Sequence, residues 1–123
     1  MDCTLNGQRW YQYVTERLNQ LERGEGDFTG LKRPSKEIVD VARTFANSFF
    51  TYYTPTPSVV PDEDGNVVFV WHKSGRKLEI IVGLEDVTVW VFEVGSKVMK
   101  SGTFAELWPT ILDLWIKEYN GNF

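Results

Sequence analysis

The stretch NVVFVWHKSGRKLEIIVGLEDVTVWVFE, residues 66–93, decides the fold of this chain. Three runs within it, 66–72, 77–82 and 87–93, carry an apolar residue at every second position, a period typical of β-strands. The two connections between these runs are four residues long, and each contains a glycine, which tight turns favour. Short turns between consecutive strands predict an antiparallel meander.

Weaker signals extend this predicted sheet at both ends. Residues 58–60, Ser-Val-Val, precede an acidic turn and form a short strand in the prediction. A last strand is expected at residues 97–100. The predicted sheet therefore has four to five strands, and consecutive strands run antiparallel because the connections between them are short.

The residues before the sheet show the period of a helix. Residues 7–23 form one amphipathic segment with Asn6 as its expected N-cap, and glycines end it. A second helix is expected at residues 35–50, with Ser35 as its cap. The first apolar face consists of Trp10, Val14, Leu18 and Leu21, and the second of Ile38, Val41, Ala42, Phe45 and Phe49.

A closing helix is expected at residues 104–119. Thr103 and Glu106 match the capping box, in which each side chain binds the other residue's backbone N–H. Pro109 complicates this start, because a proline inside a helix removes a hydrogen bond and kinks the axis. A start near Trp108, with Pro109 in the first turn, is the alternative. The apolar face consists of Phe104, Leu107, Trp108, Ile111, Leu112 and Trp115.

Together these segments predict one α+β domain at residues 1–123: two N-terminal helices, an antiparallel meander and a C-terminal helix packed on the sheet. The length of 123 residues suits a single domain. Aromatic residues make up 15% of the chain, and buried rings can supply most of a small core. The alternative is that some of these rings form an exposed binding patch.

The predicted strands are apolar on both faces. Val67, Phe69 and Trp71 alternate with Val68 and Val70, so neither set marks the side that faces solvent. An antiparallel sheet with one face in water alternates between apolar and polar residues instead. Two arrangements follow: either the helices cover both faces, or one face meets a partner.

Charge and composition argue against several classes of function. There are 13 Lys and Arg residues against 17 Asp and Glu, whereas nucleic-acid-binding proteins carry a basic excess. No apolar run approaches the length of about 20 residues that spans a membrane. The single cysteine, Cys3, cannot form an intramolecular disulfide, and residues 1–4 lack the features of a signal peptide. We therefore expect a cytoplasmic protein.

No catalytic or metal-binding pattern stands out. His72 is the only histidine, and with one distant cysteine it completes neither a catalytic triad nor a zinc site. The acidic residues 62–64 lack the spacing of a calcium loop and are interpreted as a solvated turn. Glu79 is interpreted as a surface residue at a sheet edge. If it faced the helices, it would need a partner such as Arg76 or Lys77 from the neighbouring turn, or Arg9 from the first helix. We expect no enzyme activity, no cofactor and no metal.

A pattern of turn and core residues extends over residues 24–91, the middle of the chain. It consists of Pro34-Ser35, Pro-Ser-Val-Val-Pro at 57–61, Asp64-Gly65-Asn66-Val67, Trp71 and Leu78-Glu79-Ile80. This pattern resembles that of a loosely defined family of small uncharacterised bacterial proteins, although the family tends to have a glutamate where this chain has Val70. The resemblance implies a common fold and an accessory role in bacterial or mobile-element gene clusters, such as that of an antitoxin-like or inhibitor protein.

These features favour a small intracellular protein-binding module, an antitoxin-like neutraliser or a phage-encoded inhibitor that acts by protein–protein contact. Two alternatives are a small-molecule-binding domain with an aromatic pocket and a structural homodimer. A third is an enzyme that uses Glu79 or the Asp62 cluster with a metal. The expected contact surface consists of Tyr11, Tyr13, Tyr52, Tyr53, Trp90 and Phe92, with Asp62, Glu63 and Asp64 at its rim.

Overall fold

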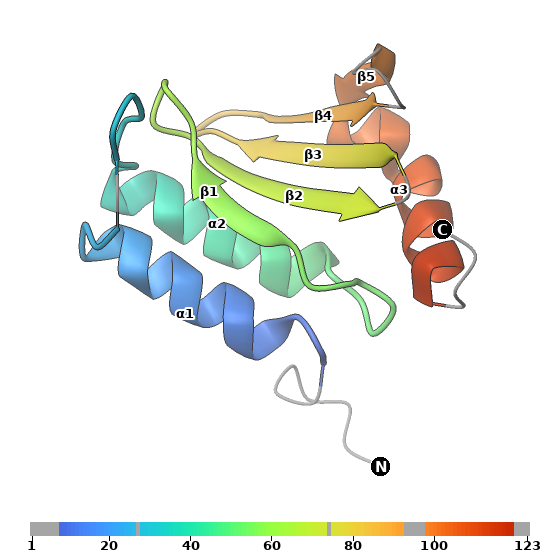
Figure 1. The fold of residues 1–123 in the computed structure, drawn as a ribbon, viewed down its shortest axis with the longest axis horizontal. Coiled ribbons are helices and arrows are strands. Elements are labelled where there is room, and N and C mark those ends of the chain that lie inside the picture. The colour runs from blue at the N-terminus through green and yellow to red at the C-terminus, as the bar shows by residue number, and fades with distance from the viewer. Residues whose placement is uncertain (1–7, 27, 74, 93–97, 120–123) are drawn as a thin grey trace.

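Three α-helices and five β-strands make up the computed structural model, which describes residues 8–26, 28–73, 75–92 and 98–119 (Figure 1). The α+β class and the order of elements are as predicted. The helices are α1 (Tyr11–Glu22), α2 (Lys36–Phe49) and α3 (Phe104–Tyr119). The strands are β1 (Ser58–Pro61), β2 (Val67–Lys73), β3 (Arg76–Val82), β4 (Val87–Phe92) and β5 (Val98–Thr103).

The strands form one antiparallel meander in the order β1-β2-β3-β4-β5. In the central hairpin, Phe69 lies opposite Ile80 and Trp71 lies opposite Leu78. These cross-strand pairs place large apolar side chains next to one another on the same face, which is the unit that stabilises a sheet. The strand pattern at residues 66–93 therefore predicted the pairing of β2, β3 and β4 correctly.

The fifth strand differs from its prediction. It continues to Thr103, which lies opposite Thr88, instead of ending at Lys100. Residues 101–103 carry no apolar side chain, so their extended conformation comes from hydrogen bonding to β4 and not from their own composition. The predicted end of the fourth strand, Glu93, and the predicted start of the fifth, Lys97, lie outside the described residues.

The first helix begins later than predicted within the described residues. Residues 8–10 form a turn, in which the Tyr11 N–H donates to the Gln8 carbonyl at 3.1 Å, and the helix continues from Tyr11. The predicted cap Asn6 and start Gly7 lie outside the described residues. The predicted apolar face is confirmed, since Trp10, Val14, Leu18 and Leu21 are all buried.

The second helix has the predicted cap but a rotated apolar face. The Ser35 hydroxyl accepts a hydrogen bond from the Ile38 N–H at 3.2 Å. Phe49, which the periodicity placed on the buried face, is 42% exposed. Because α2 contacts α1 as well as β2 and β3, the buried stripe lies between these two neighbours. Its fully buried members are Val39, Ala42, Phe45 and Ala46.

The closing helix begins at Phe104, so the alternative start near Trp108 is wrong. The capping box forms as predicted: the Thr103 N–H donates to the Glu106 carboxylate at 2.9 Å, and the Glu106 N–H donates to the Thr103 hydroxyl at 3.3 Å. Pro109 lies inside the helix. Pro109 and Ala105 are both exposed, so water can satisfy the Ala105 carbonyl that lacks its helical donor.

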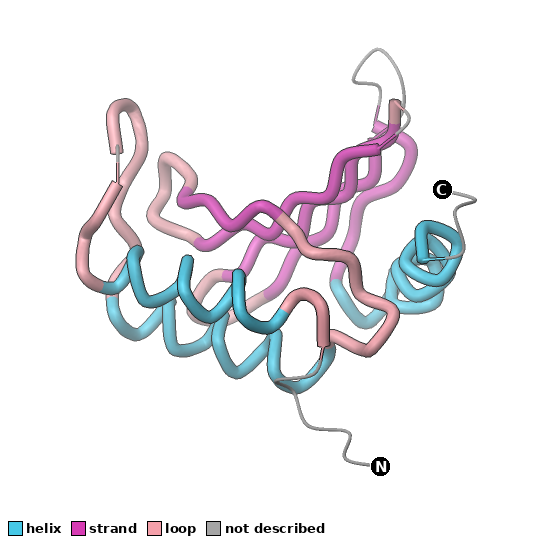
Figure 2. Tube along the Cα trace, turned by 60° about the horizontal axis from the view of Figure 1, so that its bottom comes forward, coloured by secondary structure: helices cyan, strands magenta, loops and turns pink. Residues whose placement is uncertain are grey.

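All three helices lie on one side of the sheet, as Figure 2 shows. α1 contacts β1, α2 contacts β2 and β3, and α3 contacts β4 and β5. Each helix therefore covers its own part of the same sheet face. The described helices therefore leave the other face uncovered, so the arrangement with helices on both faces is wrong.

Aromatic rings fill the space between the sheet and the helices. The centre of this cluster is Phe50, whose ring lies 5.0 Å from Phe69, 5.1 Å from Trp10 and 5.5 Å from Trp115. The Trp71 indole N–H donates to the Pro55 carbonyl at 2.7 Å, which satisfies a polar group inside the core. Many of the aromatic rings of this chain are therefore part of the core. Each ring pair in such edge-to-face geometry stabilises the fold by about 0.5–1.5 kcal/mol beyond the burial of its surface.

Candidate functional site

The face of the sheet opposite the helices, the open face, is the candidate functional site. Side chains alternate along a strand, so every residue between two core positions points to this face. The core positions of β3, Leu78 and Ile80, are at most 1% exposed, whereas Glu79 and Ile81 are only half-buried. The open face consists of Val60, Val68, Val70, Lys77, Glu79, Ile81, Thr88, Trp90 and Phe92, with Ser58, His72, Ser101 and Thr103 at its margins.

The centre of the open face is apolar although no helix covers it. Val60, Val68 and Ile81 are direct neighbours across three strands. Val68 is only 5% exposed because its neighbours shield it, and Val60 on the edge strand is 38% exposed. Next to this row, Val70 pairs with Glu79, which pairs with Trp90. A contiguous exposed apolar patch on a small domain marks an interaction site more often than chance.

One end of the open face combines rings with an ion pair. The rings of Trp90 and Phe92 stack 6.3 Å apart at an angle of 17°. The Lys77 ammonium lies 4.8 Å above the Phe92 ring and 3.2 Å from the Glu79 carboxylate. The acid and the base on this face therefore neutralise each other. The face as a whole has little net charge, although the chain carries −4.

The six rings of the predicted contact surface come from three separate places. Trp90 and Phe92 lie on the open face and are half-buried. Tyr11 is half-buried and packs edge-to-face on Trp10, and Tyr13 is exposed on α1. Tyr52 and Tyr53 are exposed in the segment after α2, with their rings 5.7 Å apart.

The acidic residues of the predicted rim organise their own turn. The Asp62 carboxylate accepts hydrogen bonds from the Asp64 N–H at 2.9 Å, the Asn66 N–H at 2.9 Å and the Asn66 side-chain amide at 3.0 Å. Gly65 has a φ of +83°, which favours glycine in this turn. Glu63 and Asp64 are exposed. Asp62 thus serves the hairpin, and only its two neighbours offer charge to a partner.

The two ends of the sheet carry opposite charge. Antiparallel order brings the β1–β2 and β3–β4 turns to one end, where Val67 lies opposite Val82, and the β2–β3 turn to the other. The first end, called the acidic end, carries Asp62, Glu63, Asp64, Glu85 and Asp86, with Lys32 beside the β1–β2 turn. The second end, called the basic end, carries Arg76, which lines the cavity against α3, and Lys77, which pairs with Glu79.

Glu79 and His72 are the other residues that the sequence singled out. Glu79 lies on the central strand β3, so its predicted place at a sheet edge is wrong, and its carboxylate pairs with the Lys77 ammonium at 3.2 Å. His72 is exposed at the end of β2. Among the described residues, no three His, Cys, Asp or Glu side chains lie close enough together to hold a metal ion.

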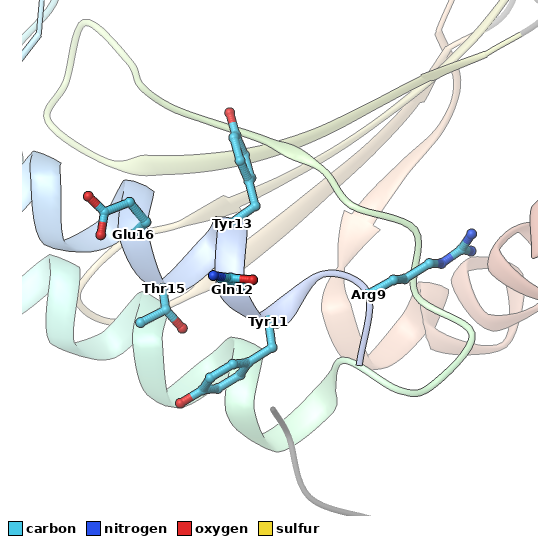
Figure 3. A pocket seen from close by; sticks show the side chains of 6 residues that line it. All are labelled: Arg9, Tyr11, Gln12, Tyr13, Thr15 and Glu16. Atoms are coloured by element: carbon cyan, nitrogen blue, oxygen red, sulfur yellow. The ribbon is translucent and has the colours of Figure 1, made fainter. Parts of the chain in front are cut away.

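The cavity beside two of the predicted contact residues is open, and the polar side chains around it do not point toward a common centre. A cavity of about 810 Å³ is lined by residues of α1 and the turn before it, including Arg9, Tyr11 and Tyr13. Figure 3 shows that the labelled side chains fan outward, with Tyr11 and Tyr13 pointing to opposite sides of the helix. A small-molecule site instead needs a few polar groups aimed at one point. A smaller cavity of about 180 Å³ lies against α3 at the basic end, next to Arg76, Lys100 and Lys117.

Comparison with known proteins gives no indication of function. No family model matches the chain, and neither curated proteins nor solved structures give a match. Within the described part of the chain, no helix has both the length and the apolar character needed to cross a membrane. The sequence alone could not identify the open face, because both alternating sets of strand residues are apolar.

Proposed function

We propose that this protein is a protein-binding module whose contact surface is the open face of its sheet. The observation that supports the proposal most is the apolar row of Val60, Val68 and Ile81 on the face that the described helices leave uncovered. Trp90 lies in the neighbouring row of the same face. Residues of these types gain about 25 cal/mol for each Å² that a partner removes from water. Trp90 is the residue best suited to anchor a partner, since tryptophan is enriched among residues that dominate binding energy.

A protein is the class of partner that matches this surface. The open face is a sheet surface with little net charge, and the basic excess that binds nucleic acid is missing from the composition. Small molecules bind in concave pockets with converging polar groups, whereas flat apolar surfaces with a polar margin are typical of protein interfaces. The exposed hydroxyl residues Ser58 and Ser101 at the margin supply hydrogen-bonding groups for the rim of such an interface.

A site-specific crosslinker tests the proposal. Trp90 is replaced by the photoreactive residue p-benzoylphenylalanine, and the chain is irradiated in the cells that produce it. The matched control carries the same residue at Tyr13, an aromatic position that is 44% exposed on α1. We expect a discrete protein adduct from position 90 that position 13 does not give. If the variant with the crosslinker at position 90 keeps its melting temperature but gives no protein adduct, the open face is not the contact surface.

The more specific expectations remain predictions. An antitoxin-like neutraliser or a phage-encoded inhibitor in the cytoplasm would each use such a contact surface, and the mass of the adduct identifies the partner. The resemblance to the family of small bacterial proteins supports a shared scaffold, because Pro57, Pro61, Gly65 and Trp71 all lie in turns or in the core.

A further inference from the structure

We infer that the cavity of about 180 Å³ at the basic end binds a small carboxylate that carries a short apolar chain. This site is separate from the proposed contact surface, because it lies on the helix side of the sheet. Three properties of the described residues carry the inference: the surplus of cationic side chains around the cavity, the two buried apolar residues in its wall, and the exposure of its two lysines.

The strand register brings two cationic residues to the side of the sheet that α3 covers. Lys100 on β5 lies directly opposite Val91 on β4, and residues in opposite positions share a face. Val91 in turn lies opposite the core residue Leu78, and Arg76 precedes Leu78 by two positions on β3. Because side chains alternate along a strand, Arg76 and Lys100 both lie on the helix side. Both line the cavity together with Val91.

One side of α3 completes the wall of the cavity. Its lining residues follow one another at intervals of three or four positions, which places them on one side of the helix: Thr110, Asp113, Leu114 and Lys117. The Lys117 ammonium pairs with the Asp113 carboxylate at 2.9 Å, and Thr110 adds a hydroxyl that can donate a hydrogen bond. The wall therefore combines polar groups from β3, β5 and α3.

The charge of the wall favours an anion. Among the described residues that line the cavity, three are cationic and one, Asp113, is acidic, which leaves a surplus of two positive charges (three minus one) in a chain whose net charge is −4. Lys117 pairs with that acid, whereas Lys100 pairs with no carboxylate in the described part of the chain. A local surplus of one sign of charge raises the concentration of ions of the opposite sign.

The apolar residues restrict the class of anion. Val91 is 5% exposed and Leu114 is 7% exposed, so both are packed in the core and present apolar surface to the cavity. A short alkyl chain gains free energy from contact with such surface, whereas an inorganic phosphate has no group that does. The volume is below the range of roughly 300–1,000 Å³ that is typical of sites for drug-sized ligands. A monocarboxylate with a chain of a few carbon atoms matches both the charge and the size.

The two lysines leave the cavity accessible to such a ligand. Lys100 and Lys117 are exposed, so their ammonium groups lie in water while their alkyl stems line the cavity. Ammonium and guanidinium groups bind carboxylates through charge-assisted hydrogen bonds. Ion pairs that water reaches contribute little free energy, so we expect a dissociation constant in the millimolar range.

Titration with butyrate tests the site. Sodium butyrate replaces sodium chloride at constant ionic strength, and NMR follows the methyl signals of Val91 and Leu114, with Val60 on the open face as the internal reference. We expect saturable shifts at Val91 and Leu114 and none at Val60. Butyramide, which has the same chain without the charge, should cause no saturable shift. Inorganic phosphate should bind about tenfold more weakly than butyrate.

Two matched lysine variants locate the binding site. Lys100→Gln removes a positive charge from the wall and should raise the dissociation constant of butyrate about tenfold. Lys36→Gln removes the same charge from an exposed lysine on α2 that is not among the described residues of the wall, and it should leave the constant unchanged. Both positions are exposed, so both variants should keep the native melting temperature.

Three results would each overturn the carboxylate site: shifts that do not saturate, equal affinity for phosphate and butyrate, or equal weakening by the two lysine variants. Lys100 would then serve only as a charged residue that keeps the β5 edge from pairing with another chain. Crosslinking at position 90 reports on the opposite face of the sheet, so the carboxylate site and the proposed contact surface can fail independently.

Discussion

Two adjacent isoleucines test the assignment of the sheet faces. Ile80 and Ile81 lie side by side on β3 and point to opposite faces of the sheet. Ile80 is 0% exposed between Phe69 and Val89, whereas Ile81 is half-buried on the open face. We expect Ile80→Ala to cost about 2–5 kcal/mol of unfolding free energy, the range for truncating a buried isoleucine. Ile81→Ala should cost about 1 kcal/mol, because water already reaches part of its side chain.

Urea denaturation of both variants measures this difference. The melting temperature should follow, with a fall of about 4 °C for each kcal/mol lost in a domain of this size. Equal costs for the two variants would mean that both faces are covered and would refute the reasoning.

Three further predictions concern the elements that hold the sheet in place. Pro109→Ala should stabilise the protein by about 1 kcal/mol in urea denaturation, because it restores a helical hydrogen bond at an exposed position, and a loss of stability would show that α3 needs its proline. Trp71→Phe should cost about 2 kcal/mol, since the buried Pro55 carbonyl loses its indole donor, and a calorimetric melting temperature within experimental error of the native value would contradict this. Hydrogen bonds from the Thr103 N–H and hydroxyl lower the pKa of the Glu106 carboxyl group in the folded protein. The stability that this carboxylate contributes is therefore present above the ordinary glutamate pKa of about 4.3 and is lost as the pH falls through the lower folded value. The destabilisation caused by Glu106→Gln should be full at neutral pH and shrink in acid, and a difference that does not depend on pH would exclude a role for this charge.

Local signals in the sequence were sufficient for most of the fold. The alternation at residues 66–93 predicted β2, β3 and β4, and Ser35 and the Thr103–Glu106 box predicted two helix starts. Each of these signals lies within a few residues of the structure it specifies. The core face of α1 was also predictable, because one face of that helix carries all of its large apolar residues.

The errors occurred where tertiary contacts decide the structure. β5 extends through Ser101 and Gly102 because β4 supplies its hydrogen-bond partners, and no residue in that segment signals a strand. The apolar stripe of α2 is rotated because the helix contacts α1 and the sheet at once, which exposes Phe49. Pro109 is tolerated because it lies on an exposed side of α3, a fact that depends on how the helix packs.

The candidate site was only partly predictable for the same reason. Trp90 and Phe92 were selected as contact rings, and they do lie on the open face. Val60, Val68 and Ile81 were not selected, since alternation in strands with two apolar faces does not say which face the helices cover. The opposite charges at the two ends of the sheet follow from the strand order and could have been found from the turn compositions once a meander was predicted.

Solvent accessibility of individual methyl groups tests the central claim most directly. A soluble paramagnetic probe broadens NMR signals from methyl groups that water reaches, and Ile80 serves as the buried reference for Ile81 on the same strand. We predict broadening at Ile81, Val60 and Val70 but not at Ile80. An Ile81 signal that is as protected as the Ile80 signal would contradict the account.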